Sequence, residues 1–565
     1  MAAERASFEV QVQKDGRWST ETVRDTEEEA LASAKRYLGD KKCEGARVIR
    51  NWTRHDGRVV ETEVFCETRT VSDDGPVRIN AIEDAPPRCE TPDQYTALQS
   101  RMVMNRLFRA YLDKAFVTPT ELLHNYRELK RLQDKDNLVP SAVDRVAVLQ
   151  TRDGGQDSRS RGEEIHKNLD RIAVRARKAE ALKLPKLNGS FAKLHRQVAD
   201  LGEGDPDYLA LVALSRDLVN LRNWVAKLDR LCRLAETETD PHALELLDGV
   251  IADVLGANVV HEVLGWQPGL GPAIIAMFDL ADGCLRTDKS DVGECAEVLN
   301  RLFAQRKLPA SRTCLLDRAH RQIRSGNPLF KAEPAKERDA FLAVVNRVLT
   351  PTGFVEGPET AEALTLRQTR MVVEGGAAGR RAALSATFHA MPDTAYGLMY
   401  LCAMAHTAMA KEHAPDIAEL MERVLATRSI GELCQRGLGI KERLVRATNA
   451  HHAVMASPFP QPVRTRVAEH IDAVLERHLI DEKIIEKLDH PDSALRDRAV
   501  RLVQFCAAGV LPEGKALARA RQRIVALLRQ PNFDQRFIEG IEDPAKAGKA
   551  LTDFHHLLVK AGFGG

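Results

Sequence analysis

The sequence lacks the short motifs that mark most catalytic sites. It contains no Gly-x-Ser-x-Gly nucleophile motif, no His-Glu-x-x-His motif and no phosphate-binding loop ending in Gly-Lys-Ser/Thr. Its ten cysteines are spread singly, so the Cys-x-x-Cys pairs of zinc ribbons and thioredoxin-like proteins are absent too. The sequence therefore favours a protein that is not an enzyme, and it predicts no cofactor and no metal site. A catalytic site assembled from distant residues stays open as an alternative.

Aromatic residues and net charge are also low. Phe, Trp and Tyr make up 5% of the chain, a composition that suits packed helices better than a β-sandwich or barrel. The 82 basic and 81 acidic residues give a formal net charge of +1. Whole-chain electrostatics therefore gives no reason to expect nucleic acid or an anionic membrane as a partner, and such binding would need a local basic patch.

Long apolar runs are missing as well. The most apolar stretch, residues 271–280, is too short to cross a bilayer. The first residues lack the apolar core of a secretory signal, and unpaired cysteines suit a reducing compartment. We therefore expect a cytoplasmic protein without a membrane span.

The sequence is rich in helical periodicity from about Asp93 to its end. In residues 208–234, for example, leucines recur every three or four positions, which predicts one long amphipathic helix. With 565 residues the chain exceeds the usual size of a single domain. The predicted fold class is mainly α, with a multi-helical, irregular α-solenoid-like body behind a small N-terminal α+β module.

The N-terminal module is predicted to have the order β-α-β-β. Phe8, Val10 and Val12 alternate with polar residues, as in a half-buried strand, and a helix is expected at about 26–37. Two further strands are expected at 46–54 and 59–69. Between them Asp56-Gly57 gives a strong hairpin signal.

The predicted organisation has six parts. Their boundaries follow from shifts in composition and from Pro- and Gly-rich joins. They are an α+β module (1–71), a linker (72–92), a helical hairpin (93–150), a flexible loop without apolar residues (151–162), a helical domain (163–350) and a second helical domain (351–565).

One segment of the second helical domain, residues 484–503, resembles a HEAT repeat. An apolar helix is followed by an Asp489-His-Pro-Asp turn, and Leu495-Arg496, Ala499 and Leu502 match the start and core positions of a second helix. The resemblance implies a superhelical interaction scaffold. An ordinary helical hairpin is the alternative.

Histidines and a conspicuous tryptophan give weaker signals. His406 and His413, and the doublets at 451–452 and 555–556, lack the i, i+4 spacing of a helical metal site. Trp266, in a Gly- and Pro-rich loop at 265–272, is expected to anchor the joint between two helices.

The main candidate site is a basic stripe. Its members follow i, i+4, i+8, i+11 spacing and are Lys167, Arg171, Arg175 and Lys178. Such a stripe suits phosphates, an acidic protein segment or lipid headgroups. The alternative is a solvated face with the acidic partners Glu163, Glu164 and Asp170 nearby. A second basic cluster, at 519–529, has the same two interpretations. Neither has interleaved aromatics for base stacking.

These observations favour a non-enzymatic cytoplasmic adaptor or regulatory scaffold that binds another protein through helical surfaces. Two alternatives remain at this point. One is a nucleic-acid-associated factor that uses the basic helix face, and the other is an enzyme with a dispersed site.

Overall fold

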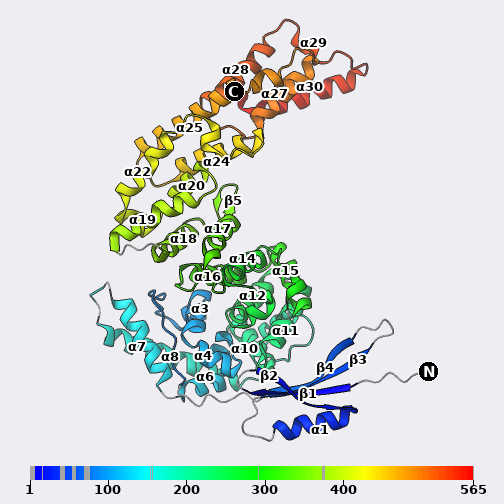
Figure 1. The fold of residues 1–565 in the computed structure, drawn as a ribbon, viewed down its shortest axis with the longest axis vertical. Helices are drawn as coiled ribbons and strands as arrows, with labels where there is room; N and C mark the ends of the chain where they lie inside the picture. The colour runs from blue at the N-terminus through cyan, green and yellow to red at the C-terminus, as the bar shows by residue number, and fades with distance from the viewer. Residues whose placement is uncertain are drawn as a thin grey trace, which may run out of the picture. The chain divides into compact units, whose positions relative to one another are not determined.

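The computed structural model describes residues 7–14, 17–38, 45–53, 59–68, 77–135, 137–152, 154–155, 157–290, 292–371 and 376–563. The chain forms two compact units, Met1–Val77 and Arg78–Gly565. The structure is 69% helical, with 30 α-helices in the described residues (Figure 1). The mainly α-helical fold and the small N-terminal sheet are therefore confirmed.

The first unit is a four-stranded antiparallel sheet in the order β2-β1-β3-β4, with one helix packed against β1 and β3. Its elements are β1 (Ser7–Lys14), β2 (Arg17–Arg24), α1 (Glu27–Leu38), β3 (Gly45–Thr53) and β4 (Val59–Thr68). Val10, Val12, Ala34 and Val48 are fully buried between sheet and helix. The turn predicted at Asp56-Gly57 lies outside the described residues, but the strands on either side of it are paired.

Strand β2 is missing from the predicted β-α-β-β order, so the observed order is β-β-α-β-β. It lies at the edge of the sheet, and none of its residues from Trp18 to Arg24 is buried. Val23, for instance, is 51% exposed. A strand that buries neither face needs no alternation of apolar and polar residues, so the sequence carries no signal for it.

The second unit begins with an extended segment that packs on its helices. Residues 78–91 belong to the predicted linker, yet Ile82 and Cys89 are buried. Arg145 Nη2 donates to the Ile82 carbonyl at 2.6 Å, and Gln150 Nε2 donates to the Pro87 carbonyl at 2.9 Å. The described part of the predicted linker is therefore bound to α7 (Leu138–Thr151).

The region predicted as a helical hairpin and a loop holds more helix than expected. It contains α2 (Pro92–Thr96), α3 (Leu98–Leu107), α4 (Arg109–Ala115), α5 (Pro119–His124), α6 (Tyr126–Gln133), α7 and α8 (Ser158–Glu180). Helix α8 starts inside the predicted flexible loop 151–162, because the Asp157 side chain caps it by accepting from Ser160 N. Arg161, in its first turn, is 1% exposed, so an arginine takes a buried position where the sequence shows no apolar residue.

The single helix predicted for residues 208–234 is two helices, α10 (Pro206–Leu218) and α11 (Trp224–Thr237). Asn223 starts the second by accepting from Val225 N at 2.7 Å. Leu218 and Leu228 are both fully buried, so the leucine period continues across the break and conceals it in the sequence.

The rest of the second unit continues as helices. The bounds up to residue 371 are α9 (Phe191–Ala199), α12 (Pro241–Leu255), α13 (Val259–Leu264), α14 (Leu270–Ala281), α15 (Gly293–Ala304), α16 (Pro309–Arg324), α17 (Glu337–Val348), β5 (Leu349–Thr350), β6 (Gly353–Phe354) and α18 (Gly357–Met371). Those that follow are α19 (Gly376–Ala390), α20 (Thr394–Met404), α21 (Ala408–Glu412), α22 (Ala414–Leu425), α23 (Ile430–Leu433), α24 (Ile440–Ala456), α25 (Gln461–Asp481), α26 (Ile484–Leu488), α27 (Leu495–Ala507), α28 (Lys515–Leu528), α29 (Phe533–Phe537) and α30 (Pro544–Leu558).

Among the described residues of the second unit, a small and a large apolar core hold these helices together. A small one lies among α2 to α8 and includes Tyr95, Leu129 and Ile165. The main core runs from Ala179 to Ala561 without a division near residue 350. Among the described helices, none has the length and apolar character needed to cross a membrane.

Two local features of the sequence, Trp266 and the HEAT-like segment, are placed as follows. Trp266 was expected to anchor its joint but is 72% exposed, so that prediction is wrong. The loop is held by its backbone instead, because Gly271 N donates to the Leu329 carbonyl at 2.9 Å. In the HEAT-like segment, Asp489 lies buried at the turn between α26 and α27 and accepts from Arg498 Nε at 2.7 Å and from Arg523.

Candidate functional site

The four residues of the basic stripe lie on α8 but do not share one environment. Lys167, Arg171 and Lys178 are exposed, whereas Arg175 is half-buried. At about 100° per residue, Arg175 is the member of the stripe nearest the buried face of α8. The structure therefore gives the stripe three exposed cations and one that is partly enclosed.

Arg175 is occupied by contacts within the protein. Its Nη1 lies 2.5 Å from Asp93 Oδ1, its Nη2 lies 2.8 Å from Asp205 Oδ2, and its guanidinium stacks 3.7 Å above the Tyr208 ring. It ties α8 to the start of α2 and to the start of α10. We therefore assign Arg175 to the packing of α8 and remove it from the candidate binding residues.

The other end of the stripe borders a hollow in the surface, which we call the basic depression. It has a volume of about 260 Å³ and is lined by Arg88, Glu90, Arg161, Glu164, Lys167, Asn168 and Arg171. Four cationic side chains face two carboxylates there, which leaves an excess of two positive charges. The depression thus joins two members of the predicted stripe to Arg88 and Arg161, which the sequence did not single out.

Arg161 forms the floor of the depression. Its Nε donates to Gln150 Oε1 at 2.7 Å, its Nη1 to Glu164 Oε2 at 2.7 Å and its Nη2 to the Cys89 carbonyl at 2.9 Å. Asn168 Nδ2 donates to the Glu90 carbonyl at 3.2 Å. Because these bonds join α8 to α7 and to residues 88–90, the depression is built on a fixed frame.

Next to α8 the small core borders a largely apolar pocket of about 110 Å³, whose lining includes six leucines, four valines and Arg161. Apolar cavities of about 150 Å³ accept a benzene molecule. This one has room only for a smaller apolar group, and we assign it to packing.

Two buried charged clusters fix the helices next to α8. Lys227 of α11 is paired with Glu121 of α5, and both side chains are 0% exposed. Arg101 Nη1 lies 2.9 Å from Asp253 Oδ2, which also accepts from Thr120 N at 2.8 Å. Burial raises the pKa of Glu121, against the effect of Lys227, and burial raises the pKa of Asp253, against the effect of Arg101. Their enclosure leaves no access for a substrate, so these carboxylates hold the fold.

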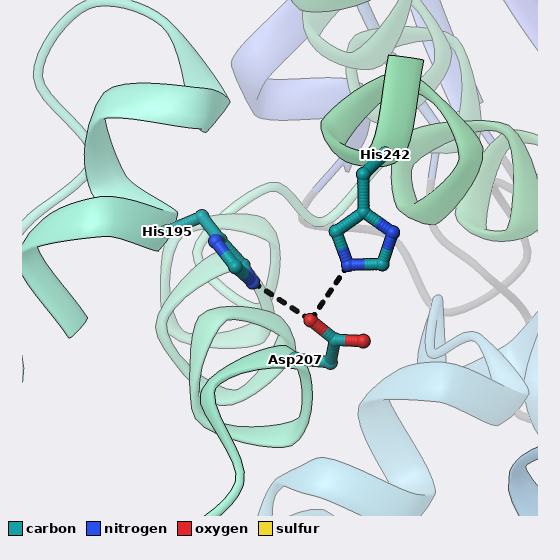
Figure 2. A group of neighbouring side chains, drawn as sticks. All are labelled: His195, Asp207 and His242. Carbon is teal, nitrogen blue, oxygen red and sulfur yellow. Dashed lines mark hydrogen bonds and ion pairs between the residues drawn. The ribbon is translucent and has the colours of Figure 1, made fainter. Parts of the chain in front are cut away.

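A second candidate constellation, the histidine cluster, consists of His195, Asp207 and His242 (Figure 2). His195 lies on α9, Asp207 in the first turn of α10 and His242 in the first turn of α12. The His195 Nε2 lies 2.7 Å and the His242 Nε2 2.8 Å from the same Asp207 Oδ1. The two rings meet edge to face, with their centroids 5.4 Å apart.

Helix caps put these side chains in place. Asp205 caps α10 by accepting from Asp207 N at 3.1 Å, and Asp240 caps α12 by accepting from Ala243 N at 2.9 Å. Burial favours the neutral form of Asp207, but hydrogen bonds from His242 and His195 outweigh it and lower the pKa of Asp207. The hydrogen bond to Asp207 in turn raises the pKa of His242.

The sequence carried no signal for the histidine cluster. Its members are 12 and 35 residues apart on three helices, a spacing that matches no motif. Among the histidines that the sequence analysis weighed, His413 is buried, with its Nδ1 3.0 Å from Asp416 Oδ2, and Arg380 Nε donates to its Nε2 at 3.2 Å.

The second basic cluster is largely paired. Arg521 binds Glu513 through two bonds of 2.8 Å and donates to the Ala561 carbonyl. Arg523 binds Asp489, and Arg519 lies 3.8 Å from Glu476. These arginines join the last helices to one another and carry no site.

Comparison with known proteins gives no further guide to this site, since no family model, no curated protein and no solved structure shows a significant match to the chain.

Proposed function

We propose that this protein is a non-enzymatic cytoplasmic adaptor that binds an acidic segment of a protein partner at the basic depression. The observation that carries the proposal is the arrangement of Arg88, Lys167 and Arg171 around one hollow with an excess of two positive charges. Arginine side chains pair with carboxylates in a two-pronged geometry, and a lysine adds a mobile charge. An acidic segment therefore fits this site by chemistry and by size.

The same site suits nucleic acid less well. No aromatic side chain lines the depression, so it offers bases no surface on which to stack. Glu90 and Glu164 stand at its wall and repel a continuous run of phosphates. A peptide, by contrast, can place separate carboxylates at Arg88, Lys167 and Arg171 and uncharged groups beside these two acids.

The proposed binding residues differ from the original stripe. Lys167 and Arg171 remain. Arg88 joins them because its contacts with Glu90 and Glu164 are long, at 3.8 and 3.6 Å. Arg175 leaves because it is held by two short internal ion pairs of 2.5 and 2.8 Å. Lys178 is exposed but does not line the depression. This difference supplies a matched control on the same helix.

The test is fluorescence anisotropy with a labelled Glu- and Asp-rich peptide as the probe. We expect the double variant Lys167→Glu, Arg171→Glu to bind about tenfold more weakly or worse, and the control Arg177→Glu, Lys178→Glu to bind like the wild type. All four residues are exposed, and exposed substitutions change stability by less than about 0.5 kcal/mol each. Equal affinities for the wild type and the first double variant would overturn the proposal.

A single-stranded oligonucleotide is the second probe. Tighter binding of the oligonucleotide than of the peptide, with a steep loss of affinity as salt increases, would replace the adaptor proposal with the nucleic-acid alternative. For the peptide we expect the affinity to fall only gradually as salt increases, because binding forms few ion pairs and releases few counterions.

The HEAT-like segment agrees with an interaction role, and we propose it as part of the scaffold. Asp489 and its arginine partners fix the turn between α26 and α27 and join it to α28. A rigid turn of this kind keeps neighbouring helices in register, as an interaction surface requires.

A further inference from the structure

The histidine cluster presents three metal-ligand atoms to one point, and this feature is independent of the basic depression. The Nε2 atoms of His195 and His242 and a carboxylate oxygen of Asp207 all lie within 4.8 Å of one another. Figure 2 shows both imidazole rings directing their Nε2 atoms at the same Asp207 oxygen. We propose that His195, Asp207 and His242 bind a zinc ion that joins α9, α10 and α12.

The donor set selects the class of metal. Calcium and magnesium prefer sites made of oxygen atoms alone, whereas two of the three donors here are imidazole nitrogens. Two histidines and one carboxylate suit zinc, which accepts three protein ligands and leaves a fourth position for water. The site is open enough for that water, because the three side chains are 21%, 42% and 52% exposed.

The two nitrogen–oxygen distances require only a small adjustment, and the two nitrogens lie within 4.8 Å of each other. Zinc bonds of about 2.0–2.1 Å in a tetrahedral site place the ligand atoms about 3.3 Å apart. The observed nitrogen–oxygen distances are 2.7 and 2.8 Å, so the ligands have to separate by about half an ångström. Partly exposed side chains such as these reach that spacing through small changes of their side-chain torsions.

The charges around the cluster favour a cation. Asp207 is ionised, and Asp240 and Glu245 add negative potential at His242. The positive ends of α10 and α12 act against a cation, but Asp205 and Asp240 cap those ends. The carboxylates therefore offset the helix dipoles at the site.

A bound ion would tie α9 to α10 across a short loop, and both of them to α12, which follows helix α11 in the chain. Asp205, two residues before Asp207, also holds Arg175 of α8. Zinc would thus stabilise α10 between α8 on one side and α9 and α12 on the other. Because metal binds the folded chain and not the unfolded one, zinc should raise the melting temperature.

The test uses the full-length protein freed of metal with EDTA and titrated with zinc chloride in a calorimeter. We expect the wild type to bind one more zinc ion than the double variant His195→Gln, His242→Gln. The control His555→Gln, His556→Gln removes two exposed histidines and should keep the full stoichiometry. Zinc should raise the melting temperature of the wild type and the control only.

A third variant keeps the proposal testable if the double variant does not fold. Asp207→Asn keeps the shape of the side chain and its capacity to accept hydrogen bonds while removing its charge, and we expect it to weaken zinc binding by about tenfold or more. Cobalt(II) supplies a spectroscopic check, because its visible absorption on the wild type should show nitrogen and oxygen ligands and should be lost in Asp207→Asn. Unchanged zinc affinity in both variants, or no zinc binding by the wild type, would overturn the proposal. Neither result bears on the acidic-peptide site.

Discussion

Lys227 Nζ lies 2.5 Å from Glu121 Oε1 and 2.7 Å from Glu121 Oε2, and both side chains are fully buried. The pair joins α11 to α5. Glu121 also completes a capping box at the start of α5, where it accepts from Thr118 N at 2.8 Å. One carboxylate thus accepts hydrogen bonds both from the backbone at a helix end and from a buried ammonium.

Breaking this pair should be costly. Lys227→Met leaves an uncompensated buried carboxylate, and we expect a loss of about 3–5 kcal/mol in the free energy of unfolding. The double variant Glu121→Gln, Lys227→Met removes both charges and should lose less than Lys227→Met alone. Urea denaturation measures both values. A double variant less stable than Lys227→Met would show that the Glu121 carboxylate stabilises the fold even without Lys227, through its cap at Thr118 N.

Acid should destabilise the protein through its buried histidines. Burial lowers the pKa of His124 to about 3 and that of His320 to about 4. The unfolded chain binds these protons near the ordinary pKa of about 6.5, so between that pH and the folded values it binds more protons than the folded chain. Stability is therefore fully present above about pH 6.5 and falls as the pH decreases through this window.

Denaturation at a series of pH values tests whether stability falls as the pH decreases. His124→Gln should flatten the decrease below pH 6.5, by up to about 1.4 kcal/mol for each unit of pKa difference. The control is His166→Gln, which removes an exposed histidine on α8. A steeper slope for His124→Gln would contradict the assignment.

Variants of Arg175 and Lys178 should show which of these two stripe residues stabilises the packing of α8. Arg175→Gln loses two ion pairs and the stack on Tyr208, and we expect a loss of about 1–2 kcal/mol in stability. Lys178→Gln should stay within about 0.5 kcal/mol of the wild type. Thermal denaturation gives this comparison. Equal stabilities would mean that the contacts of Arg175 are compensated by solvent.

Local patterns predicted much of the fold because burial imposes a period on the sequence. Strand β1 was predicted from Phe8, Val10 and Val12, which are buried in the sheet. The break before Trp224 was missed because the leucine period continues on both sides of Asn223, whose side chain starts the new helix. Periodicity thus reports which face is buried, and it does not report where the chain turns.

The sites were harder to predict because they depend on tertiary contacts. Lys167 and Arg171 were found from their spacing on one helix, whereas Arg88 reaches the same hollow from an extended segment. Arg175 has the same spacing but is occupied by Asp93 and Asp205, far away in the sequence. The histidine cluster joins three helices, and no local pattern marks it.

The most direct test of the acidic-segment proposal is zero-length carbodiimide cross-linking of a Glu- and Asp-rich peptide to the full-length protein, read by mass spectrometry. The reaction joins a carboxylate to an ammonium only where the two are in contact. Lys167 is the one lysine that lines the basic depression. We predict that the peptide is coupled mainly to Lys167 and that Lys167→Arg removes this product. Coupling spread evenly over Lys178, Lys183 and Lys193, with none at Lys167, would contradict the proposal.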